Sequence, residues 1–186
     1  MNVQDFLKTR TEYEIKEYCQ ANAAPAAVAM MHINGDFNIS QIVRNANWFG
    51  FQEVIYFGRR KWDKRGAVGT YHYTSVKYME DFEKFIEYAR ANYNKVVALE
   101  CTDELPVQPI TTYVWDPSSI ILVGEETNGL PVEYLQQVDD IVMIPGYGSV
   151  RSLNAATSAG IAMSHYRMSP LHETKLQKQP KLTLKK

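Results

Sequence analysis

The sequence predicts an α/β fold in which a parallel sheet is covered by helices on both faces. Apolar strand-like runs and helical patterns alternate along the 186 residues. The strands read as continuous apolar runs, such as 120–123, which is typical of strands buried on both faces. Glycine-bearing turns follow two of these strands, each before a helical segment. In α/β proteins, such turns bring the backbone close to a small molecule.

Each element is expected from its local pattern, in chain order. The charged segment 4–22 predicts a helix that Pro25 ends. A buried strand over 26–33 and a turn at 34–36 lead to a helix over 39–50, whose apolar residues recur at helical spacing. The remaining expected elements are a strand over 53–57, a glycine-containing loop over 58–74, a strand over 75–79, a helix over 80–93, a strand over 95–99, a connector over 107–110 followed by a turn of helix, strands over 120–123 and 141–144, and a small-residue helix over 155–166.

Length and composition predict one domain without metal or membrane span. The division expected is an N-terminal helical extension over 1–24, a main domain over 25–167 and a basic tail over 168–186. No apolar run approaches the roughly 20 residues that cross a bilayer. The N-terminus lacks the pattern of a signal peptide, so we expect a cytoplasmic protein. The two cysteines are expected to be reduced, and no Cys/His cluster has zinc-binding spacing.

Positive charge is unevenly distributed although the net charge is only −1. The segment 170–186 holds five lysines and one glutamate, which gives +4 and leaves −5 for the rest. A second basic cluster surrounds Trp62, and its cationic members are Arg59, Arg60, Lys61, Lys64 and Arg65. Basic residues with an interleaved aromatic suit phosphate contact and base stacking, so we predict RNA contact at this cluster. A solvated loop is the alternative there, as a frayed tail is for 170–186.

Three short motifs occur in order at predicted strand ends. The first is Asn38 followed by Arg44 and then Phe49-Gly50, the second is Gly124-x-Glu126-x-x-Gly129-Leu130, and the third is Ile144-Pro145 followed by Ser152-Leu153-Asn154. Together they resemble the SpoU/TrmH class of the SPOUT methyltransferases over roughly 25–167. The sequence departs from that pattern at Ser40-Gln41, where the family often has Gly-Ala, and at Glu125, where it often has a small residue.

The resemblance implies a fold, a reaction and partners. It implies a C-terminal trefoil knot and a homodimer in which each site is completed by the partner. The reaction implied is methyl transfer from S-adenosylmethionine to a ribose 2′-hydroxyl of tRNA or rRNA. The catalytic residues implied are Arg44, Asn38, Glu126, Ser152 and Asn154, and the cofactor-binding residues are Leu99, Glu100, Gly124, Ile144, Ser152 and Leu153.

Arg44 is the residue on which the proposed chemistry mainly depends. A guanidinium stays protonated at nearly any pH, so Arg44 is not suited to act as a base. We expect instead that its positive charge lowers the pKa of the ribose hydroxyl. A surface arginine stacked on Trp48 is the alternative. Asn38 equally fits a helix N-cap, since Gln41 completes a capping-box pattern, and Ser152 also fits a helix N-cap. Glu126 is expected to orient Arg44 of the partner chain. The alternatives are a contact on the cofactor side and a favourable charge at the start of the following helix.

Other classes of function fit less well. Gly146-x-Gly148 hints at a nicotinamide-binding loop, but Arg151 occupies the third glycine position. Ser152 lacks the flanking glycines of a hydrolase nucleophile. A non-catalytic RNA-binding dimer of the same fold stays open as the alternative.

Overall fold

The computed structural model describes residues 3–33, 37–125 and 128–170. Its centre is one seven-stranded sheet with the order β3-β2-β1-β6-β4-β7-β5, and every pairing is parallel. The predicted parallel α/β class is therefore confirmed. The strands are β1 (Ala24–His32), β2 (Phe51–Gly58), β3 (Ser75–Met79), β4 (Lys95–Leu99), β5 (Gln108–Pro109), β6 (Ser119–Val123) and β7 (Asp140–Met143).

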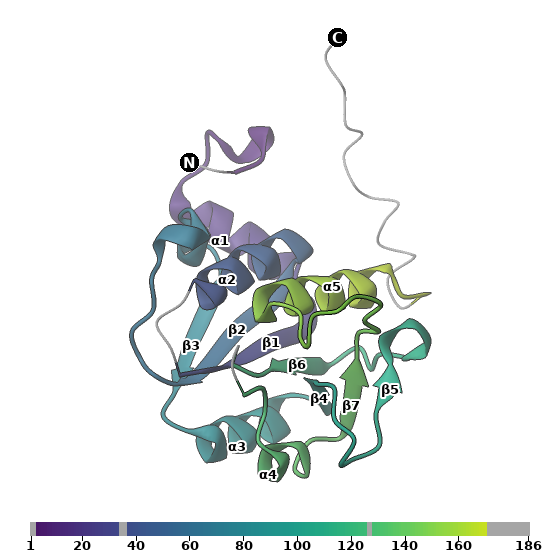
Figure 1. Ribbon diagram of the computed structural model, residues 1–186. Helices are drawn as coiled ribbons and strands as arrows, with labels where there is room; N and C mark the ends of the chain where they lie inside the picture. Colours follow the sequence, from purple (N-terminus) through teal and green to yellow (C-terminus); the bar gives the residue numbers. More distant parts are fainter. Residues whose placement is uncertain (1–2, 34–36, 126–127, 171–186) are drawn as a thin grey trace.

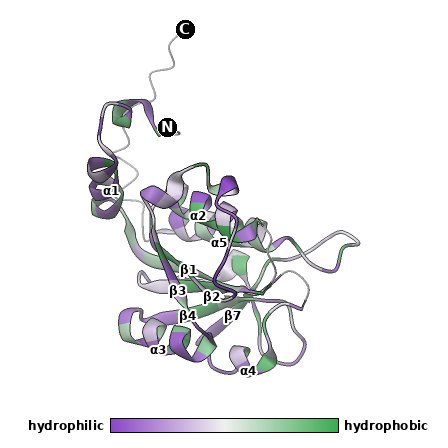
Figure 2. Ribbon diagram, turned by 90° about the vertical axis from the view of Figure 1, so that its left-hand side faces the viewer, coloured by the Kyte–Doolittle hydropathy of each residue, from purple (hydrophilic) through white to green (hydrophobic). Residues whose placement is uncertain are grey.

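Helices cover both faces of this sheet. They are α1 (Glu12–Ala21), α2 (Asn38–Phe49), α3 (Phe82–Asn92), α4 (Val132–Leu135) and α5 (Ala155–Met168), with 3₁₀ turns at Asp5–Leu7, Arg65–Ala67, Thr70–His72 and Ile110–Thr112. In Figure 1, α2 and α5 lie above the sheet and α3 and α4 below it. Figure 2 shows the hydrophobic strands between the two helical layers. Each face has its own core, one packed under α2 and α5 and the other over α3 and α4.

The N-terminal segment differs from the single helix expected over 4–22. A 3₁₀ turn precedes α1, and Thr11 starts α1 with a capping box in which its side chain and that of Glu14 bond each other's backbone N–H. This box fixes the start of the helix at 12. Pro25 does not precede the first strand but lies within β1, where the pairing with β2 shifts register between Ala24 and Ala27. A proline is tolerated at such an irregularity because no ladder hydrogen bond is required there.

Helices α2 and α5 run side by side in the same direction. The Asn45 side chain donates to the Ala156 carbonyl at 3.4 Å, and a Cβ at Gly160 would lie 3.1 Å from Asn45 Nδ2. At the far end, Arg167 donates to the carbonyl oxygens of Phe49, the last residue of α2, and of Gly50, its C-cap. A cation at a helix C-terminus satisfies orphan carbonyls and complements the helix dipole. The two helices therefore begin at the same edge of the sheet.

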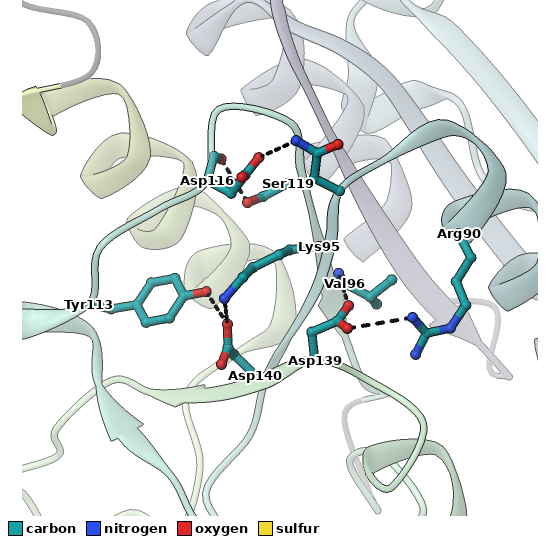
Figure 3. Close-up of polar contacts among 9 residues, drawn as sticks. Arg90, Lys95, Val96, Tyr113, Asp116, Ser119, Asp139 and Asp140 are labelled. Atoms are coloured by element: carbon teal, nitrogen blue, oxygen red, sulfur yellow. Dashed lines mark hydrogen bonds and ion pairs between the residues drawn. The ribbon is translucent and has the colours of Figure 1, made fainter.

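A cluster of polar side chains joins the strands at the opposite end of the sheet, where β4, β6 and β7 begin (Figure 3). The Asp140 carboxylate accepts from Lys95 Nζ and from the Tyr113 hydroxyl, both at 2.7 Å. Asp139 accepts from the Val96 backbone N–H at 2.7 Å and pairs with Arg90 at 3.5 Å. All these groups satisfy one another, so we assign the cluster to stability. In the described ranges, no helix is both long and apolar enough to cross a bilayer.

Candidate active site

The carboxyl ends of the parallel strands bring the three motifs to one edge of the sheet. The loop before α2 follows β1, the second motif follows β6, and the third follows β7. Strands β1, β6, β4 and β7 are neighbours in that order. Parallel strands present their carboxyl ends on one side, so loops distant in sequence meet there.

A direct hydrogen bond joins the first motif to the third. Asn154 Nδ2 donates to Asn38 Oδ1 at 2.9 Å, across 116 residues of sequence. Asn154 also starts α5, because its Oδ1 accepts from the Thr157 backbone N–H at 3.1 Å. Asn38 is only 4% exposed. Its side chain is therefore fixed between the two loops.

The capping roles differ from those that the sequence predicts. Phe37, not Asn38, is the N-cap of α2, and Asn38 is the first helical residue. The expected capping box with Gln41 is wrong, because the Asn38 side chain is directed to Asn154 instead. Likewise Asn154, not Ser152, caps α5, and Ser152 lies exposed two residues earlier.

Ser40 accounts for one departure from the family pattern. Its hydroxyl is buried and donates to the Phe37 carbonyl at 2.7 Å. A Cβ at Gly66 would lie only 2.2 Å from Ser40 Oγ, so the loop after β2 is packed tightly against the start of α2. The serine thus belongs to a contact between α2 and the basic cluster.

Arg44 lies on α2 with its side chain exposed to solvent. Within the described ranges it makes no ion pair and no stacking contact with Trp48, which is itself 77% exposed. The alternative of an arginine stacked on Trp48 therefore has no support. No hydrogen bond of the described structure joins Arg44 to the second or third motif, so its assignment to the site stays a prediction.

The second motif forms a tight loop held by a buried carboxylate. Glu125 Oε1 accepts from the Asn128 backbone N–H at 2.8 Å and from Asn128 Nδ2 at 2.7 Å. A Cβ at Gly124 would lie 2.5 Å from the Gly129 carbonyl carbon, so Gly124 allows the two arms of the loop to touch. Glu125, the second departure from the family pattern, therefore shapes this loop. Glu126 lies outside the described residues.

Glu100 connects the end of β4 to the same loop. Its Oε2 accepts from the Leu130 backbone N–H at 2.9 Å, and its backbone N–H donates to the Val142 carbonyl at 3.1 Å. A Cβ at Gly129 would lie 2.4 Å from Glu100 Oε2, and Gly129 has a φ of +68°, so both space and backbone require glycine there. Leu99, directly before Glu100, is buried. Sequence reasoning placed Glu100 here but missed its side-chain role, because that role depends on a partner 30 residues away.

The third motif provides an open loop. Ile144 is half-buried beside the core, whereas Leu153 is 47% exposed and Tyr147 is 96% exposed. Gly146 and Gly148 have open space where a Cβ would stand. Backbone groups of this loop are therefore accessible beside the end of β7.

The basic cluster lies at the same edge, after β2. All five of its cationic residues are exposed. Trp62 does not project outward for base stacking as expected. It is half-buried, with its ring edge-on to Tyr56 at 6.5 Å and to Tyr71 at 6.2 Å. The Arg65 guanidinium lies 5.4 Å from the centre of the Phe37 ring, which places the cluster against the start of α2.

A shallow groove of about 600 Å³ runs between α2 and α5. Its lining residues are Asn45, Phe49, Thr157, Gly160, Ile161, Ser164, His165 and Met168. Trp48 and Met168, on the same two helices, are each 77% exposed. Exposed apolar side chains on two neighbouring helices are typical of interaction surfaces.

Comparisons with known proteins agree with this architecture. Several solved structures share the fold, among them the following two. One is the AdoMet-bound rRNA methyltransferase from Sinorhizobium meliloti, with a TM-score of 0.68, 24% identity and coverage of 80% of this chain and 59% of that one. The other is the A. aeolicus TrmH/SpoU tRNA modifying enzyme, with a TM-score of 0.75, 20% identity and coverage of 96% and 91%.

The sequence relatives belong to the same class of protein as these solved structures. An uncharacterized tRNA/rRNA methyltransferase from Mycolicibacterium gilvum is 30% identical over 154 residues, which are 78% of this chain and 47% of the relative. This chain thus spans about half the length of that relative. A tRNA (guanosine(18)-2′-O)-methyltransferase from Escherichia coli is 24% identical over 139 residues, 73% of this chain and 60% of its own. Residues 25–164, which contain all three motifs, match the model of the SpoU rRNA Methylase family. The chain belongs to this family.

Proposed function

We propose that this protein transfers a methyl group from S-adenosylmethionine to a ribose 2′-hydroxyl of tRNA or rRNA. The observation that carries the proposal is the Asn154–Asn38 hydrogen bond, because it joins two of the three family motifs at the edge where the third also lies. The names of the relatives, which are tRNA and rRNA 2′-O-methyltransferases, support the reaction class.

The residues at this edge fit the cofactor. Glu125 Oε2 is buried and has no hydrogen-bond partner in the described structure, so the loop keeps an acceptor available. Gly146 and Gly148 leave room for close approach to the backbone. When bound, the cofactor supplies a methyl group activated by its sulfonium. The residues that would hold it are Leu99, Glu100, Gly124, Ile144, Ser152 and Leu153.

Arg44 is the residue that we assign to activation of the hydroxyl. A guanidinium beside the 2′-oxygen lowers the pKa of that hydroxyl and stabilises negative charge as it develops. The oxygen gains the methyl group and loses its proton to water or to a phosphate oxygen. Asn38 and Asn154 fix the geometry of the two loops, Ser152 is free to contact the sugar or the cofactor, and Glu126 is proposed to orient Arg44.

RNA and a second copy of the chain complete the proposed assembly. The cationic residues of the basic cluster are proposed to bind phosphates, since they are exposed beside the start of α2. The groove between α2 and α5 is proposed to dock the same face of a second copy. Arg44 lies on α2 next to Asn45, which lines this groove, and the family resemblance implies that each site is completed by the partner.

Replacement of Arg44 tests the reaction. Arg44→Ala should reduce methyl transfer to tRNA and rRNA by about 10²-fold or more, as expected when a main electrostatic stabiliser is removed. Cofactor affinity, measured by calorimetry, should stay within a few-fold. Lys84→Ala removes an exposed cation from α3, on the opposite face of the sheet, and should leave turnover unchanged.

Two outcomes would contradict the proposal. Normal turnover of Arg44→Ala would remove the arginine from the mechanism. RNA binding by the wild-type protein without any uptake of S-adenosylmethionine would instead assign a binding-only function.

A further inference from the structure

Three ring side chains of the sheet form hydrogen bonds with backbone carbonyl groups at the start of the basic cluster. They lie on β1, β2 and β3, which are neighbours in the sheet. The Tyr78 hydroxyl donates to the Gly58 carbonyl at 3.0 Å, and the Tyr56 hydroxyl donates to the Arg60 carbonyl at 2.9 Å. His32 Nε2 lies 3.1 Å from the Lys61 carbonyl oxygen. Each strand thus supplies one donor to the loop.

The histidine geometry defines its hydrogen-bonding form. A carbonyl oxygen only accepts, so Nε2 carries the hydrogen of this contact. His32 is fully buried, and its Nδ1 has no hydrogen-bond partner in the described structure. The tautomer with the hydrogen on Nε2 leaves no buried N–H unpaired. His32 Nε2 therefore acts as a donor to the loop.

The backbone of the loop is tied to β1 as well. The Arg59 backbone N–H donates to the His32 carbonyl at 2.7 Å. Gly58 has a φ of +94°, and a Cβ there would lie 2.6 Å from the same carbonyl oxygen. Loop and strand are therefore in direct contact at the point where the chain turns.

These contacts turn the apolar side of the loop inward and its cations outward. The ring of Trp62 packs on Tyr56 and Tyr71. Besides Arg65, which lies over Phe37, two further cations of the cluster lie over rings. Arg60 is 5.6 Å from the centre of Tyr78, and Lys64 is 5.1 Å from that of Tyr71. Within the loop, Asp63 pairs with the Arg65 guanidinium at 2.5 Å. The other four cations, Arg59, Arg60, Lys61 and Lys64, lie within six residues and repel one another, so a loop without fixed backbone contacts would spread them apart. The hydrogen bonds from His32, Tyr56 and Tyr78 to the loop backbone offset this repulsion.

We infer that His32, Tyr56 and Tyr78 are positioning residues that preform the basic cluster into a phosphate-binding surface. The inference rests on the proposed function, since it assumes that this cluster binds RNA. A surface that is ordered before binding loses less conformational freedom when it meets its ligand. The rings touch neither phosphate nor cofactor. They act through the carbonyl oxygens of Gly58, Arg60 and Lys61.

The hydroxyl groups can be removed without loss of the rings. Tyr56→Phe combined with Tyr78→Phe should weaken binding of unfractionated tRNA by about tenfold and raise the RNA KM to the same extent. The kcat and the affinity for S-adenosylmethionine should not change. Amide hydrogen exchange over 59–66 should become faster. Tyr134→Phe, on the face of the sheet covered by α3 and α4, is the matched control and should change none of these quantities.

His32 is tested by a pair of variants. The Gln side chain in His32→Gln keeps an N–H donor near the position of Nε2, whereas His32→Met removes it at similar size. RNA affinity should be largely kept in His32→Gln and reduced in His32→Met, with cofactor affinity equal in both. Equal RNA affinity of the two variants would overturn the role of this donor.

The charge variant Arg59→Ala/Lys61→Ala separates this inference from the proposed function. If this variant binds tRNA as the wild type does, the basic cluster is not the RNA-binding surface. The RNA-binding role proposed for the cluster and the inference then both fail. If it loses affinity while Tyr56→Phe/Tyr78→Phe does not, only the inference fails. A parallel loss of cofactor affinity in the tyrosine variant would also overturn it, because the rings would then support the fold in general.

Discussion

Asn154 uses both ends of one amide side chain. Its Oδ1 caps α5 through Thr157, and its Nδ2 reaches Asn38 at the start of α2. Helix entry and site geometry are therefore set by the same residue, and a substitution can separate the two.

Asn154→Ser should keep the N-cap of α5 and lose the hydrogen bond to Asn38. Serine caps helices about as well as asparagine, whereas Asn154→Ala should cost about 1 kcal/mol of stability. We expect Asn154→Ser to unfold near the wild-type temperature in a calorimetric scan but to lose methyl transfer as strongly as Asn38→Ala does. Adding Asn38→Ala to Asn154→Ser should cause little further loss. Full turnover of Asn154→Ser would show that the link does not matter for the reaction.

For individual residues, the sequence predicts which side chains lie close together but not which hydrogen bonds they form. The order and spacing of the motifs place Asn38 and Asn154 at one edge. Local pattern also assigns Asn38 a capping box with Gln41, and that part is wrong, because the competing partner is 116 residues away. No window on the sequence contains both. The catalytic role of Arg44 and all contacts of Glu126 stay predictions.

Elements are positioned by polar contacts at their ends as well as by packing. At the edge opposite the site, Asp140 joins β7 to Lys95 of β4 and to Tyr113 after the 3₁₀ turn. Burial alone would raise the pKa of Asp140. The hydrogen bonds from Lys95 and Tyr113 and the charge of Lys95 outweigh burial and hold that pKa below its ordinary value.

Asp140→Asn should therefore change the pH dependence of stability. A carboxyl whose pKa is lowered by folding stabilises the protein above its unfolded pKa, near 3.8, and loses that contribution as pH falls through the lower native pKa. The variant should be less stable than wild type at pH 7, and the difference should shrink below about pH 4. Thermal unfolding from pH 7 to 3 measures this. A difference that is constant with pH would contradict the assignment.

Most elements could be predicted because their patterns are local. The helix over 39–50 carries apolar residues at helical spacing and corresponds to α2. The expected helix over 4–22 failed because Thr11 and Glu14 form a better start within it. The two-residue strand β5 could not be recognised, since it is defined only by its pairing with β7.

At the scale of the whole molecule, the groove between α2 and α5 is the surface that we propose docks a second copy of the chain. Ile161 lies in the groove and is 38% exposed. A charge placed there must be desolvated in any dimer that closes over this groove.

Ile161→Lys should therefore dissociate the protein. Light scattering after size exclusion should give about twice 21.3 kDa for wild type and about 21.3 kDa for the variant, together with a loss of methyl transfer. Tyr13→Lys, at an exposed position of α1, should remain dimeric and active. A monomeric wild type with full activity would rule out a site shared between chains.

The overall class was predictable because the buried parallel strands carry an unbroken apolar pattern. The strand order was not, because β6 inserts between β1 and β4 through contacts that no local pattern encodes. The trefoil knot and the homodimer stay predictions.

This insertion has a consequence for synthesis. On a ribosome, β1 emerges early, but its partner β6 follows only about ninety residues later, at Ser119–Val123. Until then one side of β1 offers unpaired N–H and C=O groups along the apolar run Ala27–Met30, which is a template for wrong pairing. Nascent chains that stall before residue 119 should therefore aggregate or recruit chaperones, whereas chains released after α5 should not.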